Sequence, residues 1–266
     1  MSKPLISVIV PTYNRPELLR RTLASILDQS YPNIEAVVVN DAGDKKAKEV
    51  VKDFSGSGSK IFAYFENKEN KGLAGTRNVG MKNATGDYFV FLDDDDILLP
   101  YTLEFRMYMM NKLGAEIVYT RALQDIWEKI PQGYTSVHKQ LYWDCPFDRD
   151  LLLIQNIAPC CCPMFSRKAW DDSGNYQMDE NLDTSEDFDF WIALSRKTNF
   201  EELKLIDAEC SYRKDLTQMT GSRIFSNAYP IIYKRWRNTA EDITEVTKRQ
   251  NKILKGMGFN PEEYNL

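Results

Sequence analysis

Residues 5–40 read LISVIVPTYNRPELLRRTLASILDQSYPNIEAVVVN and contain the clearest secondary-structure pattern of the chain. It opens with Leu5–Val10, a β-branched run that is typical of a buried parallel strand. Pro16 suits a first helical turn, and the apolar residues from Leu19 to Leu27 recur at a helical spacing. A second strand is expected over Ile34–Asn40. The stretch therefore predicts one βαβ unit with a right-handed crossover.

The same alternation of strand and helix patterns continues along the chain. The predicted strands are residues 60–65, 87–92 and 116–120, and the predicted helices are residues 74–84, 102–113 and 186–197. Between Arg121 and Pro163 the periodicity fades while aromatic residues stay dense, which favours loops and short strands that line a cleft. The fold class predicted from these patterns is α/β, with a Rossmann-like, mixed but mainly parallel sheet flanked by helices and a C-terminal helical extension.

The tail of the chain keeps a spacing of three and four between its larger residues, from Tyr229 to Met257. This pattern favours a coiled-coil-like seam that could form a homo-oligomer, or a long helix packed on its own domain. The basic residues Lys234, Arg235 and Arg237 lie beside aromatic residues in this tail. They fit either a peripheral contact with an anionic membrane or an ordinary solvated face.

The composition restricts the class of partner. The chain has 266 residues and a net charge of −5, which argues against a nucleic-acid-binding protein, so small-molecule partners are expected. No apolar run approaches the ~20 residues of a membrane span and no signal segment opens the chain, so we expect a cytoplasmic protein. Cys160, Cys161 and Cys162 are adjacent, which suits neither a disulfide framework nor a metal site. Small buried residues are the expected interpretation.

Four consecutive carboxylates, Asp93 to Asp96, follow the hydrophobic strand predicted at residues 87–92. Like charges at one strand end repel each other unless a positive charge lies there, and hard divalent cations take oxygen ligands. One interpretation is therefore a Mg²⁺ or Mn²⁺ ion that bridges to a substrate diphosphate. The alternative is an acidic surface turn that favours the N-terminus of the following helix.

A glycine-containing turn, residues 70–80, runs into the helix predicted at residues 74–84. Gly72 and Gly75 give the backbone freedom to approach a phosphate or a base. The turn is not a P-loop, because no Gly-Lys-Ser/Thr closes it. A loop followed by a helix cap explains the same residues without a ligand.

Five motifs in this order and spacing resemble the family 2 glycosyltransferases of the GT-A fold. They are Pro11-Thr-Tyr-Asn-Arg15, Val39-Asn-Asp41, Gly72-Leu-Ala-Gly-Thr-Arg-Asn-Val-Gly80, Leu92-Asp-Asp-Asp-Asp96 and Glu186-Asp187. The resemblance runs from about Leu5 to Arg213. It implies a GT-A domain over residues 1–222, with a nucleotide-binding half at 1–120 and an acceptor-binding half at 121–222. Residues 223–266 would form the C-terminal extension.

The resemblance also implies roles for single residues in binding the donor. The predicted nucleotide-binding residues are Pro11, Thr12, Tyr13, Arg15, Asp41, Arg77, Asp93 and Asp94. The ring of Tyr13 would stack on the base, and the carboxylate of Asp41 would accept a hydrogen bond from an N–H of the base. The family's D-x-D motif falls on Asp93 and Asp95, with Asp95 as principal ligand of Mn²⁺ or Mg²⁺ and Asp93 as the second. Because the run contains four aspartates, a register shift of one residue stays open.

The acidic pair Glu186–Asp187 resembles the family's catalytic pair at the start of a helix, in which the aspartate is the base of inverting members. Residues 184–187 also fit a capping box that begins with Thr184. Two departures from the family pattern are Asn40, where an aspartate is frequent, and the missing histidine after Tyr212-Arg213. Arg213 or Lys214 could replace that histidine at the diphosphate.

The function implied is inverting transfer of a sugar from a nucleotide-sugar donor, with UDP-sugar favoured, to a hydroxyl of a saccharide or lipid-linked acceptor. One alternative is a nucleotidyltransferase that acts on sugar phosphates. Its usual Gly-rich loop with Lys or Arg after the first strand is absent, since Pro11-Thr-Tyr-Asn14 occupies that place. Another alternative is a non-catalytic carbohydrate- or nucleotide-binding module, which would not need both the aspartate run and Glu186–Asp187.

Overall fold

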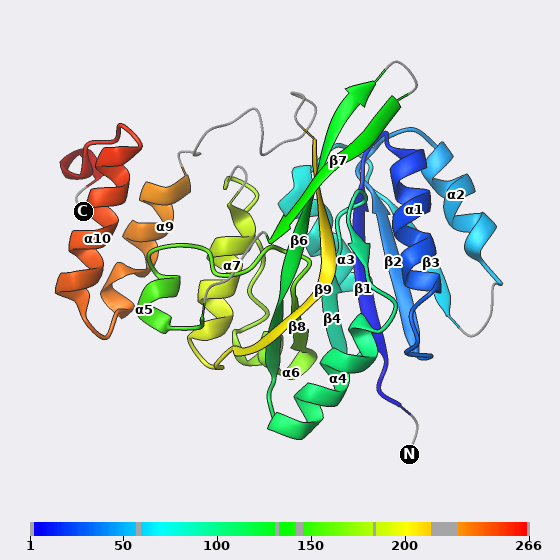
Figure 1. Cartoon of the computed structure of the whole chain (residues 1–266). Helices are drawn as coiled ribbons and strands as arrows, with labels where there is room; N and C mark the ends of the chain where they lie inside the picture. Colours follow the sequence, from blue (N-terminus) through cyan, green and yellow to red (C-terminus); the bar gives the residue numbers. More distant parts are fainter. Residues whose placement is uncertain are drawn as a thin grey trace.

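A mixed, mainly parallel sheet flanked by helices forms the body of the molecule, as predicted (Figure 1). The computed structural model describes residues 3–56, 60–130, 133–141, 146–182, 185–213 and 228–264. The predicted βαβ unit is present as β1 (Ile6–Thr12), α1 (Pro16–Leu27) and β2 (Ile34–Asn40). Strands β1 and β2 are buried along their whole length and pair in parallel. Their apolar β-branched sequence is therefore explained by burial on both faces.

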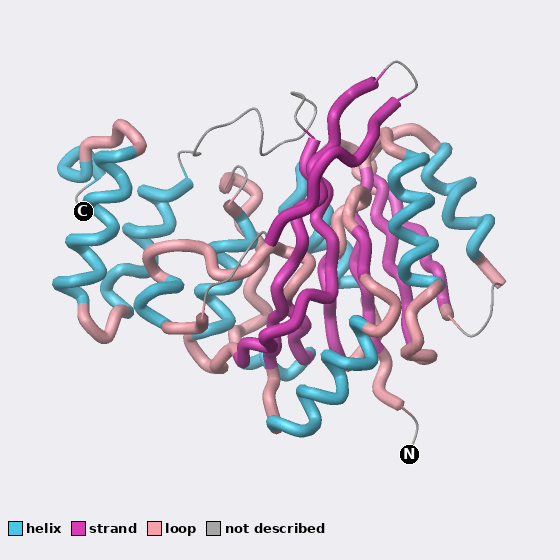
Figure 2. The backbone as a smooth tube through the Cα atoms, in the orientation of Figure 1, coloured by secondary structure: helices cyan, strands magenta, loops and turns pink. Residues whose placement is uncertain are grey.

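The strands form one layer in the order β3-β2-β1-β4-β8-β6-β9-β5, with β7 paired to β6 (Figure 2). The further strands are β3 (Ile61–Glu66), β4 (Tyr88–Phe91), β5 (Ile97–Leu98), β6 (Ile117–Ile130), β7 (Gly133–Leu141), β8 (Pro163–Ser166) and β9 (Glu201–Arg213). Strands β3, β2, β1 and β4 are parallel, whereas β8 is antiparallel to both of its neighbours. The carboxyl ends of β1, β2 and β4 therefore meet at one edge of the sheet.

Helices connect these strands. They are α2 (Lys46–Phe54), α3 (Gly72–Asn83), α4 (Thr102–Leu113), α5 (Arg149–Leu152), α6 (Arg167–Asp172) and α7 (Glu186–Ser195). The predicted helices correspond to α3, α4 and α7. Helix α3 lies unusually close to β1, because a Cβ at Gly80 would be 2.3 Å from Cγ2 of Ile9. A glycine at this position therefore allows the close approach of α3 to β1.

The region from Arg121 to Pro163 differs from its prediction. Strand β6 continues to Ile130 and forms a hairpin with β7, so the interpretation as loops and short strands is wrong for its first part. The apolar periodicity is weak there because β6 is held on both edges by main-chain pairing, to β7 on one side and β9 on the other. Ladder hydrogen bonds do not require an apolar side chain at every second position.

The C-terminal tail forms two helices that pack beside α7, at the end of the molecule that is on the left in Figure 1. They are α9 (Ala228–Trp236) and α10 (Ile243–Gly256), separated by the 3-10 turn η1 (Arg237–Thr239) and followed by η2 (Pro261–Tyr264). One continuous helix was expected, but Asp242 caps α10 by accepting from the N–H of Glu245 at 3.0 Å. A capping aspartate begins a new helix at this point.

The apolar face of this tail is covered by its own chain. Ile232, Tyr233, Val246 and Leu254 are all buried within the single chain, which supports the packed-helix interpretation of the 3,4 spacing. In the basic cluster, Arg235 donates to Asp179 and Asp189, and Arg237 donates to Gln250. The predicted domain boundary at residue 222 falls outside the described residues. Among the helices described, none combines the length and the apolar character that crossing a bilayer requires.

Candidate functional site

The aspartate run forms a short loop between β4 and β5. The loop is closed by a turn in which the N–H of Asp96 donates to the carbonyl of Asp93 at 3.0 Å. The hydroxyl of Thr22 on α1 donates to the carbonyl of Asp96 at 2.9 Å. On its far side, β5 pairs with β9. The loop is thus fixed at the carboxyl end of β4, the edge of an open α/β sheet where ligands bind.

Two of these aspartates face the end of β1. Asp94 accepts from the hydroxyl of Thr12 at 2.7 Å and from the guanidinium of Arg15 at 3.1 Å, and Arg15 also donates to Asp95 at 3.2 Å. Burial and the neighbouring Asp95 together raise the pKa of Asp94 to about 7, against the opposing effects of Arg15 and Thr12. Arg15 therefore supplies part of the positive charge that is needed to offset the repulsion among the four adjacent carboxylates.

Arg77 on α3 supplies a second positive charge and joins two motifs that are far apart in the sequence. Its Nη2 donates to Asp93 at 2.6 Å and its Nη1 donates to Glu186 at 2.5 Å. The side chain of Arg77 is only 2% exposed, whereas that of Asp93 is 32% exposed. The carboxylate of Asp93 is therefore accessible to a ligand, while its hydrogen bond to the buried Arg77 fixes its position.

The pair Glu186–Asp187 opens α7 beside this arginine. Asp187 is partly exposed and accepts from Asn156 Nδ2 at 3.0 Å and from the N–H of Phe188 at 2.8 Å. Burial and the neighbouring Glu186 together raise the pKa of Asp187 to about 7, against the opposing effects of Arg77 and the two hydrogen bonds. A carboxylate with such a pKa can accept a proton near neutral pH.

The N-cap of α7 is Ser185, whose side chain makes no capping hydrogen bond to the helix. The predicted capping box begins at Thr184, which lies outside the described residues, as do Lys214 and the side chain of Arg213.

Asp41, at the end of β2, was predicted to accept from the nucleotide base. It is buried and already accepts from Asn67 Nδ2 at 2.8 Å, and from the backbone N–H groups of Lys71 and Gly72 at 2.8 and 3.0 Å. These contacts fasten the N-terminus of α3 to β2. The carboxylate of Asp41 therefore has a structural role, because it fixes the backbone of the glycine-containing turn at Lys71 and Gly72.

The remaining predicted residues lie at the end of β1. Pro11 and Thr12 are its last two residues and are buried, whereas the ring of Tyr13 is 49% exposed. An exposed ring beside the aspartate loop is available for stacking on a base. The structure thus gathers the predicted residues at one edge of the sheet, from β1, β2, α3, the aspartate loop and the start of α7.

The carboxylates of the aspartate loop are hard oxygen donors of the kind that bind divalent cations. Within the described ranges, no group of three or more His, Cys, Asp or Glu side chains converges on one point. Mg²⁺ is commonly bound by one or two carboxylates together with substrate phosphates rather than by a cage of protein ligands. The hard oxygens of Asp93 and Asp95 fit such a shared site.

Sequence reasoning missed Asn67 and Asn156, and it expected Cys160 to be buried, whereas the structure places that residue partly exposed at the site. Asn67 donates to Asp41 and to Thr76, and Asn156 donates to Asp187. Cys160 is partly exposed beside Arg77 and Asp187, and burial raises the pKa of its thiol well above the usual value. Cys161 and Cys162 are buried as predicted. No local pattern marks Asn67 or Asn156, because their contacts to Asp41 and Asp187 join residues 26 and 31 positions apart.

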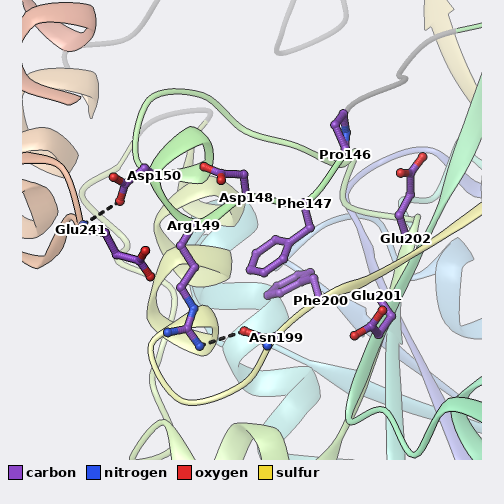
Figure 3. A pocket seen from close by; sticks show the side chains of 10 residues that line it. All are labelled: Pro146, Phe147, Asp148, Arg149, Asp150, Asn199, Phe200, Glu201, Glu202 and Glu241. Carbon is purple, nitrogen blue, oxygen red and sulfur yellow. Dashed lines mark hydrogen bonds between the residues drawn. The ribbon is translucent and has the colours of Figure 1, made fainter. Parts of the chain in front are cut away.

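A separate cavity of about 680 Å³ lies between α5, the start of β9 and the turn before α10 (Figure 3). Its lining contains none of the predicted site residues and is rich in acids. The lining residues are Pro146, Phe147, Asp148, Arg149, Asp150, Asn199, Phe200, Glu201, Glu202 and Glu241.

Comparison with known proteins identifies the sequence pattern. The family model described as glycosyl transferase family 2 matches residues 7–172. The putative teichuronic acid biosynthesis glycosyltransferase TuaG of Bacillus subtilis is 27% identical over 234 residues, covering 88% of this chain and 86% of TuaG. An uncharacterized glycosyltransferase of Rickettsia felis is 30% identical over 91% of this chain, which spans only 39% of that relative.

Solved structures share the fold. S. aureus TarS (residues 1–349) in complex with UDP-GlcNAc has a TM-score of 0.72 at 18% identity, covering 94% of this chain and 71% of that one. The mannosyltransferase PcManGT from Pyrobaculum calidifontis, in complex with GDP-Man and Mn²⁺, has a TM-score of 0.57 at 18% identity. That match covers 89% of this chain and 61% of PcManGT.

Proposed function

Because this chain belongs to the family 2 glycosyltransferases, an enzyme family, we propose that it transfers a sugar with inversion from a UDP-sugar to a hydroxyl of a saccharide or lipid-linked acceptor. The UDP-GlcNAc complex of TarS supports a uridine donor, and the name of TuaG, which refers to teichuronic acid biosynthesis, supports a saccharide acceptor. The chain spans well under two thirds of several relatives, so the proposal concerns this chain alone.

One observation carries the proposal. Arg77 links Asp93, on the loop after β4, to Glu186, at the start of α7, so the donor-side carboxylates and the acidic pair share one site. Inverting transfer requires a base on the side of the acceptor and charge compensation on the side of the leaving group. Glu186–Asp187 would supply the base, and Asp93 would help to hold the cation that compensates the charge of the leaving group.

In the proposed mechanism, Tyr13 stacks on the base and Asp93 supports the ribose. Asp187 takes the proton of the acceptor hydroxyl while the hydroxyl oxygen attacks the anomeric carbon and the nucleoside diphosphate leaves from the opposite face. Glu186 accepts a hydrogen bond from Arg77 and so keeps this arginine close to Asp187. The bond from the sugar to the diphosphate breaks as the new glycosidic bond forms, so no covalent enzyme intermediate is required.

A divalent cation completes the proposal on the donor side. Asp95 and Asp93 would hold Mn²⁺ or Mg²⁺ together with phosphate oxygens, and the bound ion would supply positive charge for the leaving diphosphate. Arg15 contacts Asp95 and keeps that carboxylate oriented.

Donor binding can be measured by thermal unfolding. UDP at 100 times its dissociation constant is expected to raise the melting temperature by about 5–10 °C, because a ligand selective for the folded state stabilises it by mass action. Mn²⁺ should enlarge this shift, and Asp95→Asn should abolish the enlargement, whereas Asp53→Asn on the exposed face of α2 should not. If UDP raises the melting temperature equally in EDTA and in Mn²⁺, donor binding does not involve the metal. If neither UDP nor another nucleotide raises the melting temperature, the proposed nucleotide-sugar donor is wrong.

The pH dependence of transfer reports on Asp187. Because only the ionised carboxylate can accept a proton and its pKa is raised to about 7, kcat should increase from pH 6 to pH 8 and then level off. The acidic limb of the kcat profile, measured at saturating donor, gives the apparent pKa. A limb near pH 4, the ordinary range of an aspartate, would contradict the assignment.

A further inference from the structure

We propose that Asn156 positions Asp187 for proton transfer, and that helices α9 and α10 hold the segment that carries Asn156. This inference rests on the proposed function, in which Asp187 is the base. It also assigns a role to the C-terminal extension, which lies outside the residues matched by the family model.

The amide of Asn156 has a fixed orientation. Its Oδ1 accepts from the N–H of Ala158 at 3.3 Å, so its Nδ2 is the group that faces Asp187, at 3.0 Å from Oδ2. The N–H of Phe188 holds the other carboxylate oxygen, Oδ1, at 2.8 Å. One donor on each oxygen fixes the plane of the Asp187 carboxylate and leaves lone pairs for an acceptor hydroxyl.

The charges around Asp187 make this hydrogen bond important. Glu186 on the same helix raises the pKa, and Arg77 on α3 lowers it. The thiol of Cys160 and the hydroxyl of Tyr229 on α9 also face the carboxylate. Among these neighbours, Asn156 is a neutral donor that favours the ionised form without adding charge.

Both C-terminal helices contact the backbone just before Asn156. The hydroxyl of Tyr233 on α9 donates to the carbonyl of Ile154 at 2.6 Å. Nε2 of Gln250 on α10 donates to the carbonyl of Leu153 at 2.8 Å. The side chains of Tyr233 and Gln250 are fully buried, so water does not compete for these two hydrogen bonds.

The same segment is tied to the turn between η1 and α10. The carboxylate of Asp150 accepts from the backbone N–H groups of Glu241 and Asp242, at 2.9 and 2.7 Å. Figure 3 shows the contact between Asp150 and Glu241 beside the acidic cavity.

Helix α9 also holds α7, the helix that begins with Glu186–Asp187. Asp189 is buried and accepts from Nε1 of Trp236 and from Nη1 of Arg235, each at 2.7 Å. One helix therefore fixes both sides of the Asn156–Asp187 hydrogen bond. The C-terminal extension therefore acts as a brace: α9 and α10 hold the segment that carries Asn156, and α9 holds the helix that carries Asp187.

The first test replaces the amide. Asn156→Ala should raise the pKa of Asp187 by about one unit, since it removes a donor to the charged form. With the pKa moved from about 7 to about 8, kcat at pH 7 should fall about fivefold and return to near the wild-type value at pH 9. Asn156→Asp is isosteric but places a carboxylate against Asp187, so its shift should be larger.

Two readouts separate positioning from a general structural effect. The pKa of Asp187 is measured without substrate from the ¹³C carboxyl shift, with the signal assigned by its loss in Asp187→Asn, and it is compared with the kcat limb. Asn260→Ala is the matched control, because Asn260 also accepts from the N–H two residues ahead and donates to a carboxylate, that of Glu263. This control should leave both readouts unchanged.

The brace is tested by Tyr233→Phe, which removes only the hydroxyl that contacts Ile154. The pKa of Asp187 should move in the same direction as in Asn156→Ala but by less, whereas Tyr264→Phe near the C-terminus should not move it. An unshifted pKa in Asn156→Ala would overturn the positioning role, and an unshifted pKa in Tyr233→Phe would overturn the brace. If Asp187→Asn keeps full activity, the proposed base fails instead.

Discussion

Asp187→Asn is expected to lower kcat by about 10²- to 10⁴-fold, because an amide cannot take the proton of the acceptor hydroxyl. The substitution keeps the size of the side chain and keeps an oxygen for the N–H of Phe188. UDP binding should therefore stay within a factor of about two of wild type. Transfer is measured by UDP release with a defined saccharide acceptor, and binding by calorimetry.

Asp171→Asn provides the control for this prediction, because Asp171 is an exposed aspartate on α6. It should leave both kcat and UDP binding unchanged. Transfer by Asp187→Asn at the wild-type rate would exclude Asp187 as the base. Loss of UDP binding in the same variant would show that Asp187 contributes to the donor site instead.

Arg77→Met is expected to lower the free energy of unfolding by about 3–5 kcal/mol, because it leaves the buried carboxylate of Glu186 without its partner. The melting temperature should fall by about 10 °C or more. Denaturant titration with circular dichroism measures the free energy. UDP binding should weaken too, since Asp93 loses the group that holds it.

The matched control is Arg20→Met on the exposed face of α1. Arg20 pairs with Asp53 at 2.6 Å, but both side chains are about half exposed, so the cost should be below about 1 kcal/mol. The double variant Arg77→Met, Glu186→Gln should recover part of the lost stability, because it removes the unpaired charge. Equal midpoints for Arg77→Met and wild type would show that the arginine does not stabilise the fold.

The first 120 residues could be predicted in large part from the sequence because their signals are local. The apolar run of β2 and the helical spacing of α1 each depend on neighbouring residues only, and both elements are where they were expected. Helix α2 was missed because it is short and mostly charged. Strand β9 was missed because its residues alternate weakly and its pairing partner, β6, lies far away in the sequence.

For the candidate site, the motifs identified residues but not their contacts. The carboxyl ends of β1, β2 and β4 share a sheet edge, so Thr12, Asp41 and Asp94 could be expected to lie near one another. The link from Arg77 to Glu186 joins residues 109 positions apart, and no local pattern encodes it. Asn156 could not be predicted either, since its role depends on where the segment before β8 packs.

The aspartate loop is held at both ends before any donor arrives. β4 pairs with β1 on one side, β5 pairs with β9 on the other, and Thr22 holds the carbonyl of Asp96 between them. A loop that is already ordered loses little conformational entropy when a ligand docks. The aspartate loop is thus preorganised, and differences in residence time between related donors should arise from other parts of the proposed site.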